Sequence, residues 1–249
     1  MIEDWIVPDW PAAPRVRAVC TTRHGGHSVG PHSSMNPAAH VGDDPDAVEA
    51  NRQTLQHMLQ LPAPPCWLQQ VHGTTVIDAA EVFENVEVPV ADAAFCSQPG
   101  IACAVLTADC LPLLLCDRDG RQVAALHAGW RGLAAGVIEH TVEAMQQPGE
   151  SLLAWLGPAI GPAVYQVGDE VREVFLNHDK QAQAAFQLDP EGGWKADLYR
   201  LARQRLAERG VTAVYGGDAC SFSDAERFFS YRRDGVTGRM ATLIWLQAG

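Results

Sequence analysis

Short apolar runs of strand length recur along the chain and are separated by polar turns. They occupy residues 16–19, 101–106, 111–116, 123–126, 152–156, 211–215 and 240–246. Most of these runs do not alternate with polar residues, which is typical of strands that are buried on both faces. The pattern therefore predicts several strands in the interior of the protein.

Longer segments have apolar residues three and four positions apart, which predicts amphipathic helices. Residues 132–147 show this period, with their apolar side chains on one face. A helix at 47–59 follows Asp43-Asp-Pro-Asp, whose acidic residues and proline suit a helix start. Further helices are predicted at 169–175 and 195–209.

Other segments are less regular. A strand pair is predicted at 66–71 and 74–77, on either side of His72-Gly73, whereas residues 80–90 fit no element. Residues 24–40 and 228–235 are polar and predict loops. Strands and helices are mixed rather than strictly alternating, so we expect one α+β (mixed α/β) domain over residues 1–249, with layered sheets and no linker.

Composition and charge exclude several classes of protein. Hydrophobic residues make up 47% of the 249 residues, which is ordinary for a globular protein. The formal net charge of −12, without a dense basic patch, argues against a nucleic-acid partner. No apolar stretch approaches the roughly 20 residues that span a bilayer, and Met1-Ile-Glu-Asp-Trp lacks the basic start of a signal peptide. We expect a cytoplasmic protein with no membrane partner.

The seven cysteines include no Cys-x-x-Cys pair and are expected to be reduced thiols. Cys110, His72 and His127 each end or follow a predicted buried strand, where a scaffold can present side chains to one pocket. Imidazole and thiolate are ligands that Zn²⁺ prefers, and three protein ligands leave a fourth position open. The spacing does not force these residues together, and each also has an ordinary interpretation as a buried histidine or thiol.

The same residues allow a second chemistry. Cys110 and His127 could form a nucleophile pair, with Asp109 beside Cys110 in the sequence. A thiolate that binds a metal is not free to attack, so the two interpretations exclude each other while metal is bound. Sequence motifs of zinc deaminases, dinucleotide-binding proteins, P-loop proteins and serine hydrolases are absent, as is the His-x-His of multicopper clusters.

Two arginines are candidates for phosphate binding. Arg23 precedes the polar loop, and Arg131 lies at a predicted helix start, where backbone amides add donors. An exposed or ion-paired arginine is an equally good interpretation of each. Four histidines of the loop could suggest a second metal, although a solvated loop is favoured: His24, His27, His32 and His40.

Seven segments taken together resemble the YfiH/YlmD family, also called the laccase-domain or multicopper polyphenol oxidase family. They occur in family order between about residues 16 and 246. The segments are Thr21-Thr-Arg-His-Gly-Gly-His-Ser, Gln69-Gln-Val-His-Gly, Ala91-Asp-Ala, Leu106-Thr-Ala-Asp-Cys-Leu-Pro-Leu, His127-Ala-Gly-Trp-Arg-Gly, Leu156-Gly-Pro-Ala-Ile-Gly-Pro and Phe229-Ser-Tyr-Arg-Arg-Asp.

The resemblance implies a single α-β-β-α layered domain with zinc held by His72, Cys110 and His127, and copper as a substitute metal. It implies phosphorolysis of adenosine, inosine and S-methyl-5'-thioadenosine, with adenosine deamination as a second activity. Asn36 becomes a candidate for binding ribose or phosphate, although Ser34-Met-Asn-Pro departs from the usual Asn-Leu pair of the family.

The leading hypothesis is therefore a zinc-dependent purine nucleoside phosphorylase, monomeric or homodimeric. Asp109 and Arg131 are its candidate catalytic residues, and Arg23 is expected to hold phosphate. Three alternatives remain: a laccase-like copper oxidase, a cysteine hydrolase acting on cell-wall muropeptide precursors, and a non-catalytic interaction protein stabilised by a metal.

Overall fold

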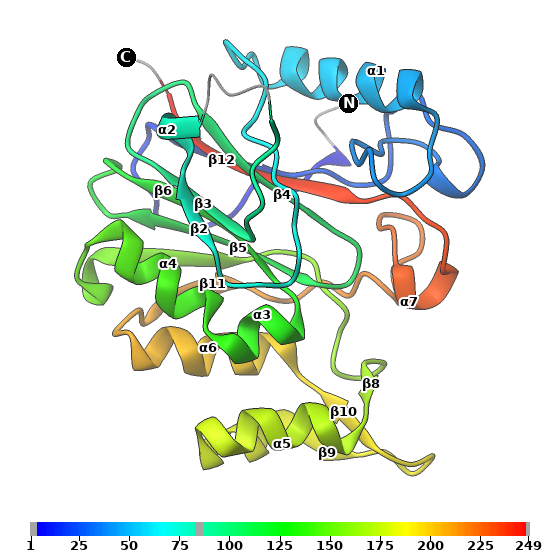
Figure 1. Cartoon of the computed structure of the whole chain (residues 1–249), viewed down its shortest axis with the longest axis vertical. Helices are drawn as coiled ribbons and strands as arrows, with labels where there is room; N and C mark the ends of the chain where they lie inside the picture. Colours follow the sequence, from blue (N-terminus) through cyan, green and yellow to red (C-terminus); the bar gives the residue numbers. More distant parts are fainter. Residues whose placement is uncertain (1–3, 83–86, 248–249) are drawn as a thin grey trace.

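Two β-sheets lie face to face between two layers of helices (Figure 1). The computed structural model describes residues 4–82 and 87–247. The larger sheet has the strand order β11-β7-β5-β6-β3-β2, and the smaller has the order β1-β12-β4. A third, small sheet has the order β8-β10-β9. The strands are β1 (Val16–Cys20), β2 (Val76–Asp78), β3 (Ala93–Cys96), β4 (Ala102–Thr107), β5 (Leu111–Asp117), β6 (Val123–Ala128), β7 (Leu152–Leu156), β8 (Gln166–Val167), β9 (Phe186–Leu188), β10 (Trp194–Ala196), β11 (Ala213–Gly216) and β12 (Met240–Leu246).

Helices cover the outer face of each large sheet. The α-helices are α1 (Pro45–Met58), α2 (Ala79–Val82), α3 (Trp130–Ala135), α4 (Val137–Met145), α5 (Asp169–His178), α6 (Leu198–Glu208) and α7 (Tyr231–Asp234). The 3-10 helices are η2 (Gly30–His32), η3 (Gly149–Ser151) and η4 (Lys180–Ala185). In Figure 1, α1 lies beyond the smaller sheet, and α4 and α6 lie beyond the larger one.

Three hydrophobic clusters separate the four layers. Leu55 of α1 packs with Leu243 of β12 in one cluster. A second cluster fills the space between the two sheets, and a third packs the larger sheet against α3, α4 and α6. Strand β5 packs on both faces of the larger sheet, because Leu113 and Leu115 belong to the third cluster, under the helices, whereas Leu114 belongs to the second, between the sheets. Burial on both faces explains why its sequence is a continuous apolar run. The predicted mixed α/β, α-β-β-α architecture is confirmed.

The predicted single helix at 132–147 is wrong, because the chain forms two helices there. Gly136 has a φ of 102°, which ends α3 and begins α4. A left-handed residue cannot continue a right-handed helix, and glycine adopts this conformation without a steric penalty. The hydrophobic period continues across the break, so periodicity alone did not reveal it.

Three other local predictions need correction. Residues 194–196 form β10 rather than the start of a helix, and α6 begins after Asp197, whose side chain caps it. The strand pair predicted around His72-Gly73 is reduced to isolated bridges at Cys66 and Gln69 and the short strand β2. The loop predicted at 228–235 contains α7. Part of the unassigned segment 80–90 lies outside the described residues.

A smaller unit projects from one end of the molecule. Helix α5 and η4 pack against the small sheet β8-β10-β9, away from the two large sheets (Figure 1). The segment that leads from β7 into β8 brings Tyr165 to the wall of the cavity described below, and the start of α6 brings Leu198 there. In the part of the chain that the structure describes, no helix is both long enough and apolar enough to cross a membrane.

Candidate active site and metal centre

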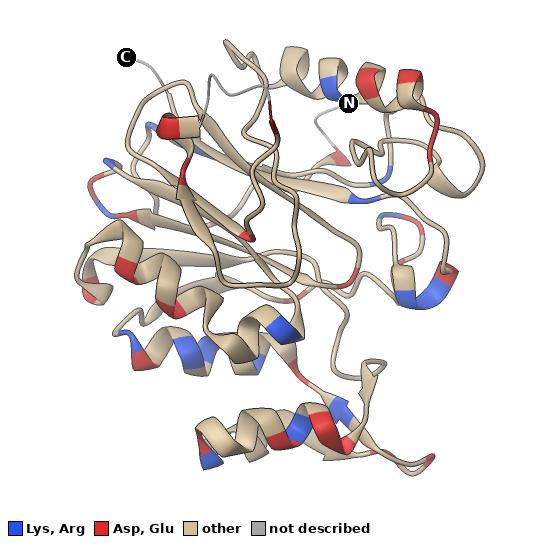
Figure 2. Cartoon of the chain, viewed as in Figure 1, with Lys and Arg blue, Asp and Glu red and all other residues tan. Residues whose placement is uncertain are grey.

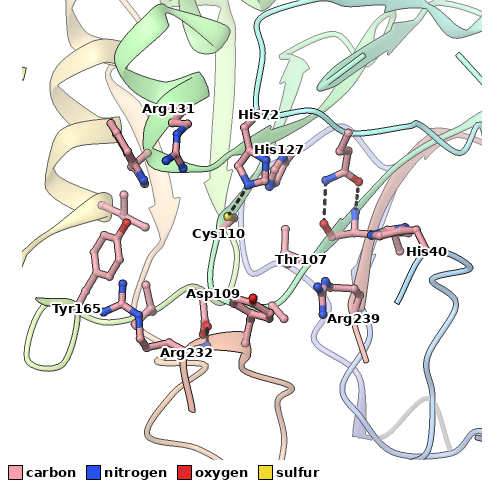
Figure 3. Close-up of a pocket in the computed structure, with 17 residues that line it drawn as sticks. His40, His72, Thr107, Asp109, Cys110, His127, Arg131, Tyr165, Arg232 and Arg239 are labelled. Carbon is pink, nitrogen blue, oxygen red and sulfur yellow. Dashed lines mark hydrogen bonds between the residues drawn. The ribbon is translucent and has the colours of Figure 1, made fainter. Parts of the chain in front are cut away.

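A cavity of about 550 Å³ opens where strands of both large sheets end. Its wall includes residues of the connection between β4 and β5, the end of β6 and the start of α3. Segments distant in sequence close it, among them His40, Tyr165 and Arg239 (Figure 3). The cavity therefore depends on the whole fold rather than on one local segment.

The three predicted metal-binding residues converge at this cavity. His72, Cys110 and His127 each offer one ligand atom, and these atoms all lie within 4.8 Å of one another. The Cys110 Sγ atom is 3.7 Å from His72 Nε2. The two imidazole rings meet edge to face, with centroids 4.7 Å apart and an interplanar angle of 72°. Two nitrogens and one sulfur at this spacing can hold a divalent metal ion.

Asp92 positions two of these residues, a role that the sequence analysis missed. Its carboxylate is fully buried and lies 2.8 Å from His127 Nδ1, which directs the other ring nitrogen of His127 toward the ligand cluster. The same carboxylate accepts hydrogen bonds from the backbone N–H groups of Val71, His72 and Gly73. Carboxylates that hold metal-binding histidines in this way are a common feature of metal sites.

Burial alone would raise the pKa of the Asp92 carboxyl. The hydrogen bonds from His127, Gly73 and Val71 and the charge of His127 outweigh burial and lower this pKa. Asp92 is therefore ionised at neutral pH. The only sequence signal for Asp92 was its place in the Ala91-Asp-Ala segment.

Cys110 and His127 favour a thiolate–imidazolium pair when no metal is bound. Burial would raise the pKa of Cys110, but the charge of His127 and hydrogen bonds from both histidines lower it to about 6. Burial would likewise lower the pKa of His127, yet the Cys110 thiolate and Asp92 raise it to about 9. A thiolate that forms at neutral pH is the form that binds metals.

Gly129 leaves room for the ligand cluster. A Cβ atom at this position would lie 2.6 Å from His72 Cδ2 and 3.0 Å from Cys110 Sγ. Any larger residue would therefore displace a ligand side chain. Gly132 has a similar role at the start of α3, because its Cβ would lie 2.8 Å from the carbonyl oxygen of Gly73.

Asp109 lines the cavity, but its carboxylate is already engaged. Ser221 Oγ donates to Oδ1 at 2.7 Å, and the backbone N–H of Arg232 donates to Oδ2 at 2.6 Å. The backbone of Asp109 has a φ of 93°, which is uncommon for a residue with a side chain. Asp109 thus fixes the loop that carries Cys110 against the N-terminus of α7.

Of the two arginines predicted to hold phosphate, only Arg131 reaches the cavity. Its guanidinium stacks on the ring of Trp130, 4.4 Å from the centroid. Arg23 lies elsewhere, where it donates to the carbonyl oxygens of Ser33 and Ala225. The structure does not bring Arg23 together with the metal-site residues.

Asn36 is fully buried and does not line the cavity. Its side-chain oxygen accepts from the backbone N–H of Arg239 at 3.0 Å, and its amide donates to Asp43. Asn36 therefore does not reach the cavity in this structure, and its contact with ribose or phosphate stays a prediction. Asn36 instead positions the backbone of Arg239.

The loop histidines form no second metal site. Within the described residues, the other group with metal-ligand spacing is Glu139, His178 and Glu208. Arg205 occupies that group, because its guanidinium bonds both Glu139 and His178, so the group is an ion-pair network. His27 bonds Thr54 of α1, and only His40 of the four loop histidines lines the cavity.

The cavity is positively charged in an acidic protein. Three arginines line it: Arg131, Arg232 and Arg239. Only Arg131 among them was a candidate from the sequence. Asp109 is the one carboxylate among the lining residues, and both its oxygens are engaged. In Figure 2 basic positions lie on α3 and α7, the helices that flank the cavity, as well as on α6, whereas acidic positions are spread over many elements, α7 included. This arrangement attracts an anion.

These features define a mixed α/β protein with a candidate His-Cys-His metal centre at the wall of a positively charged cavity. Residues 17–247 match the family described as multi-copper polyphenol oxidoreductase laccase, and the chain belongs to this family. The resemblance predicted from the sequence is confirmed.

Curated relatives cover almost the whole chain. A Pseudomonas aeruginosa protein named purine nucleoside phosphorylase is 55% identical over 244 residues, which cover 98% of both chains. The Escherichia coli purine nucleoside phosphorylase YfiH is 52% identical over 242 residues, which cover 97% of this chain and 98% of that protein.

Solved structures share the fold. A Neisseria meningitidis protein superposes with a TM-score of 0.95 at 47% identity, covering 98% of this chain and all of that one (100%). YlmD from Geobacillus stearothermophilus superposes with a TM-score of 0.87 at 32% identity, covering 96% of this chain and 94% of that one.

Proposed function

We propose that the protein is a zinc-dependent purine nucleoside phosphorylase. The observation that carries the proposal is that one cavity is lined both by the His-Cys-His group and by three arginines. The only carboxylate among the lining residues, Asp109, is bonded to Ser221 and to the backbone of Arg232. A phosphorylase needs both an anion site for phosphate and a means of stabilising charge on the substrate. The names of the relatives from Pseudomonas aeruginosa and Escherichia coli agree with this function.

The donor set fits zinc. Tetrahedral zinc with bonds of about 2.1 Å to nitrogen and about 2.3 Å to sulfur separates these atoms by about 3.6 Å. The distance between Cys110 Sγ and His72 Nε2 is 3.7 Å. Three protein ligands would leave one coordination position of zinc open, which is typical of catalytic zinc. Bound zinc would act as a Lewis acid on a substrate oxygen or a water molecule.

The residues of the chain would bind and orient the two substrates. In phosphorolysis a phosphate oxygen forms a bond to C1′ of the ribose, and the glycosidic bond breaks with its electron pair leaving on the purine. The arginines would hold phosphate and keep its charge close to the cationic ribose of the transition state. The aromatic rings of Trp130 and Tyr165 offer faces for the base. Asp109 and Arg131 are the candidate catalytic residues, Asp109 by fixing the Cys110 loop.

The substrates proposed are adenosine, inosine and S-methyl-5'-thioadenosine, with adenosine deamination as a second activity. The deciding assay supplies purified protein with inosine and phosphate and measures ribose 1-phosphate. We expect product from the wild type, none without phosphate, and at least a hundredfold less from Cys110→Ala. Absence of ribose 1-phosphate with each of the three nucleosides would refute the phosphorylase. Ammonia release from adenosine tests the deaminase separately.

A cysteine hydrolase is the second candidate, and the pKa of Cys110, which the charge of His127 lowers to about 6, supports it. Removing the metal distinguishes the two functions. A nucleophilic cysteine keeps its activity in metal-free protein and loses it to a thiol reagent, whereas the phosphorylase loses activity with the metal. A laccase-like oxidase needs several coppers. Within residues 4–82 and 87–247, His72, Cys110 and His127 form the only group that combines imidazole and thiolate at metal-ligand spacing.

A further inference from the structure

Thr107 carries a hydroxyl group that the free protein does not use. The residue is 1% exposed and lines the cavity, and its Oγ1 atom has no hydrogen-bond partner among the described residues. An unpaired buried hydroxyl reduces stability, because it has lost its bonds to water without replacing them. A group of this kind on a cavity wall points to a ligand that completes it.

Arg239 directly precedes Met240, the residue of β12 that pairs with Thr107 of β4 in the smaller sheet. Both residues line the cavity and appear on the same side of Cys110 in Figure 3. Thr107 is three residues before Cys110 in the sequence, so the pair lies beside the candidate metal centre.

The charge of Arg239 is not neutralised by a carboxylate. Its Nη1 atom donates to the carbonyl oxygens of Thr237 and Gly238, and its guanidinium lies over the ring of Tyr231, another cavity-lining residue, 5.8 Å from the ring centroid. None of the ion pairs among the described residues includes Arg239. Partial burial lowers its pKa, which is a sign that its charge is short of solvation.

Arg239 is better suited to hold an anion than the other arginines of the cavity. All three guanidinium groups lie over aromatic rings, but Arg131 and Arg232 are exposed. Arg239 is half-buried, where the charge of a bound anion is less screened by water. Asn36 also fixes its backbone through the bond to its N–H group.

We propose that Thr107 and Arg239, with His40 beside them, form the phosphate subsite of the cavity. This inference rests on the proposed function for its ligand, but its geometry stands independently. A hydroxyl donor next to a guanidinium matches an oxyanion with several acceptor oxygens. The nucleoside then occupies the remainder of the cavity, toward Trp130 and Tyr165.

Thr107→Val tests the subsite without removing any bond that the free protein makes. Isothermal titration with inorganic phosphate should show affinity about tenfold or more below wild type, the effect of one hydrogen bond to a charged group. The melting temperature without phosphate should stay equal or rise, because the unpaired hydroxyl is gone. A threonine with only a structural role would not combine these two results.

Arg239→Gln should abolish phosphate binding at millimolar concentrations, and Arg239→Lys should retain part of it. Arg200→Gln is the matched control, because Arg200 is exposed on α6 and does not line this cavity. In the phosphorolysis assay, Thr107→Val should raise the KM for phosphate while the KM for inosine stays unchanged. If Arg239→Gln fails to fold, Thr107→Val and Arg239→Lys decide the question.

The possible failures are distinct. Wild-type protein that binds phosphate through Thr107 but makes no ribose 1-phosphate refutes the phosphorylase and keeps the anion subsite. Phosphorolysis with a normal phosphate KM in Thr107→Val and Arg239→Lys keeps the phosphorylase and overturns the subsite. Wild-type protein that shows no phosphate binding in titration also overturns the subsite.

Discussion

Asp92 holds both histidines of the candidate metal centre, so it is the residue whose loss is most informative. One oxygen orients the His127 ring, and both accept backbone N–H groups of the loop that carries His72. An amide in place of the carboxylate keeps the size but loses the charge and turns one acceptor into a donor.

Asp92→Asn should therefore lower zinc affinity about 10- to 100-fold, the usual effect of losing a carboxylate behind a histidine ligand. Competition with a coloured chelator measures this affinity. Asp9→Asn is the control, because Asp9 is exposed and distant from the cavity wall. Equal affinities of the two variants would contradict the positioning role of Asp92.

Gly129→Ala should lose most of its bound metal, because the new Cβ would lie 2.6 Å from the His72 ring. Gly73→Ala is the matched control: its Cβ would make ordinary contacts of 3.4 Å with Asp92 and 3.5 Å with Val71. Elemental analysis of both purified proteins gives the metal content. Full occupancy in Gly129→Ala would show that the ligands tolerate displacement.

Metal affinity should rise with pH between 6 and 9. In the metal-free protein Cys110 has a pKa of about 6 and His127 a pKa of about 9, so in this window the pair carries one proton, on His127. Metal binding requires neutral imidazole and releases that proton, which strengthens binding about tenfold per pH unit. Chelator competition at pH 6.5, 7.5 and 8.5, corrected for the chelator's own protonation, measures the slope. A flat profile would mean that His127 is already neutral.

At the scale of elements, the break between α3 and α4 determines where Trp130 and Arg131 lie. Gly136 has a φ of 102°, and a Cβ there would meet only the Glu139 side chain at 3.5 Å. The constraint is thus on the backbone rather than on space.

Gly136→Ala should lower the free energy of unfolding by about 1–2 kcal/mol, the cost of a left-handed residue with a side chain. Urea denaturation measures the change, with an unchanged m-value if the fold is kept. An unaltered midpoint would indicate that the backbone at Gly136 relaxes at no cost.

Strands buried on both faces were predictable because such burial leaves an uninterrupted apolar run, as in β4, β5 and β7, whereas the short strands β3, β8, β9 and β10 were not predicted. The helix break at Gly136 was not, since the apolar period continues through it. Among site residues, the His-Cys-His group followed from strand ends and the family resemblance. Thr107 lies in the Leu106-Thr-Ala-Asp-Cys segment, but nothing there pointed to Arg239, because the two are brought to one cavity by the pairing of β4 with β12.

At the scale of the whole molecule, the three hydrophobic clusters are complete without a metal. The metal-site residues lie at the edge of these clusters. Metal-stripped protein should therefore keep its native circular dichroism spectrum, in contrast to small domains that fold only around zinc.

Its melting temperature should nevertheless fall and recover when zinc is returned, because a ligand that binds only the folded state stabilises it. Thermal melts with chelator, without chelator and after zinc addition test this expectation. Unfolding on chelation at 25 °C would indicate a structural metal rather than a catalytic one.

Strand β12 has a consequence for how the protein is made. It is the most C-terminal strand described, yet it lies between β1 and β4 and places Arg239 beside Thr107. A nascent chain on the ribosome therefore has no central strand in this sheet until residues 240–246 have been synthesised. Helices α3 to α6 can form earlier, but competence to bind ligand has to wait until residues 239–246 have left the exit tunnel.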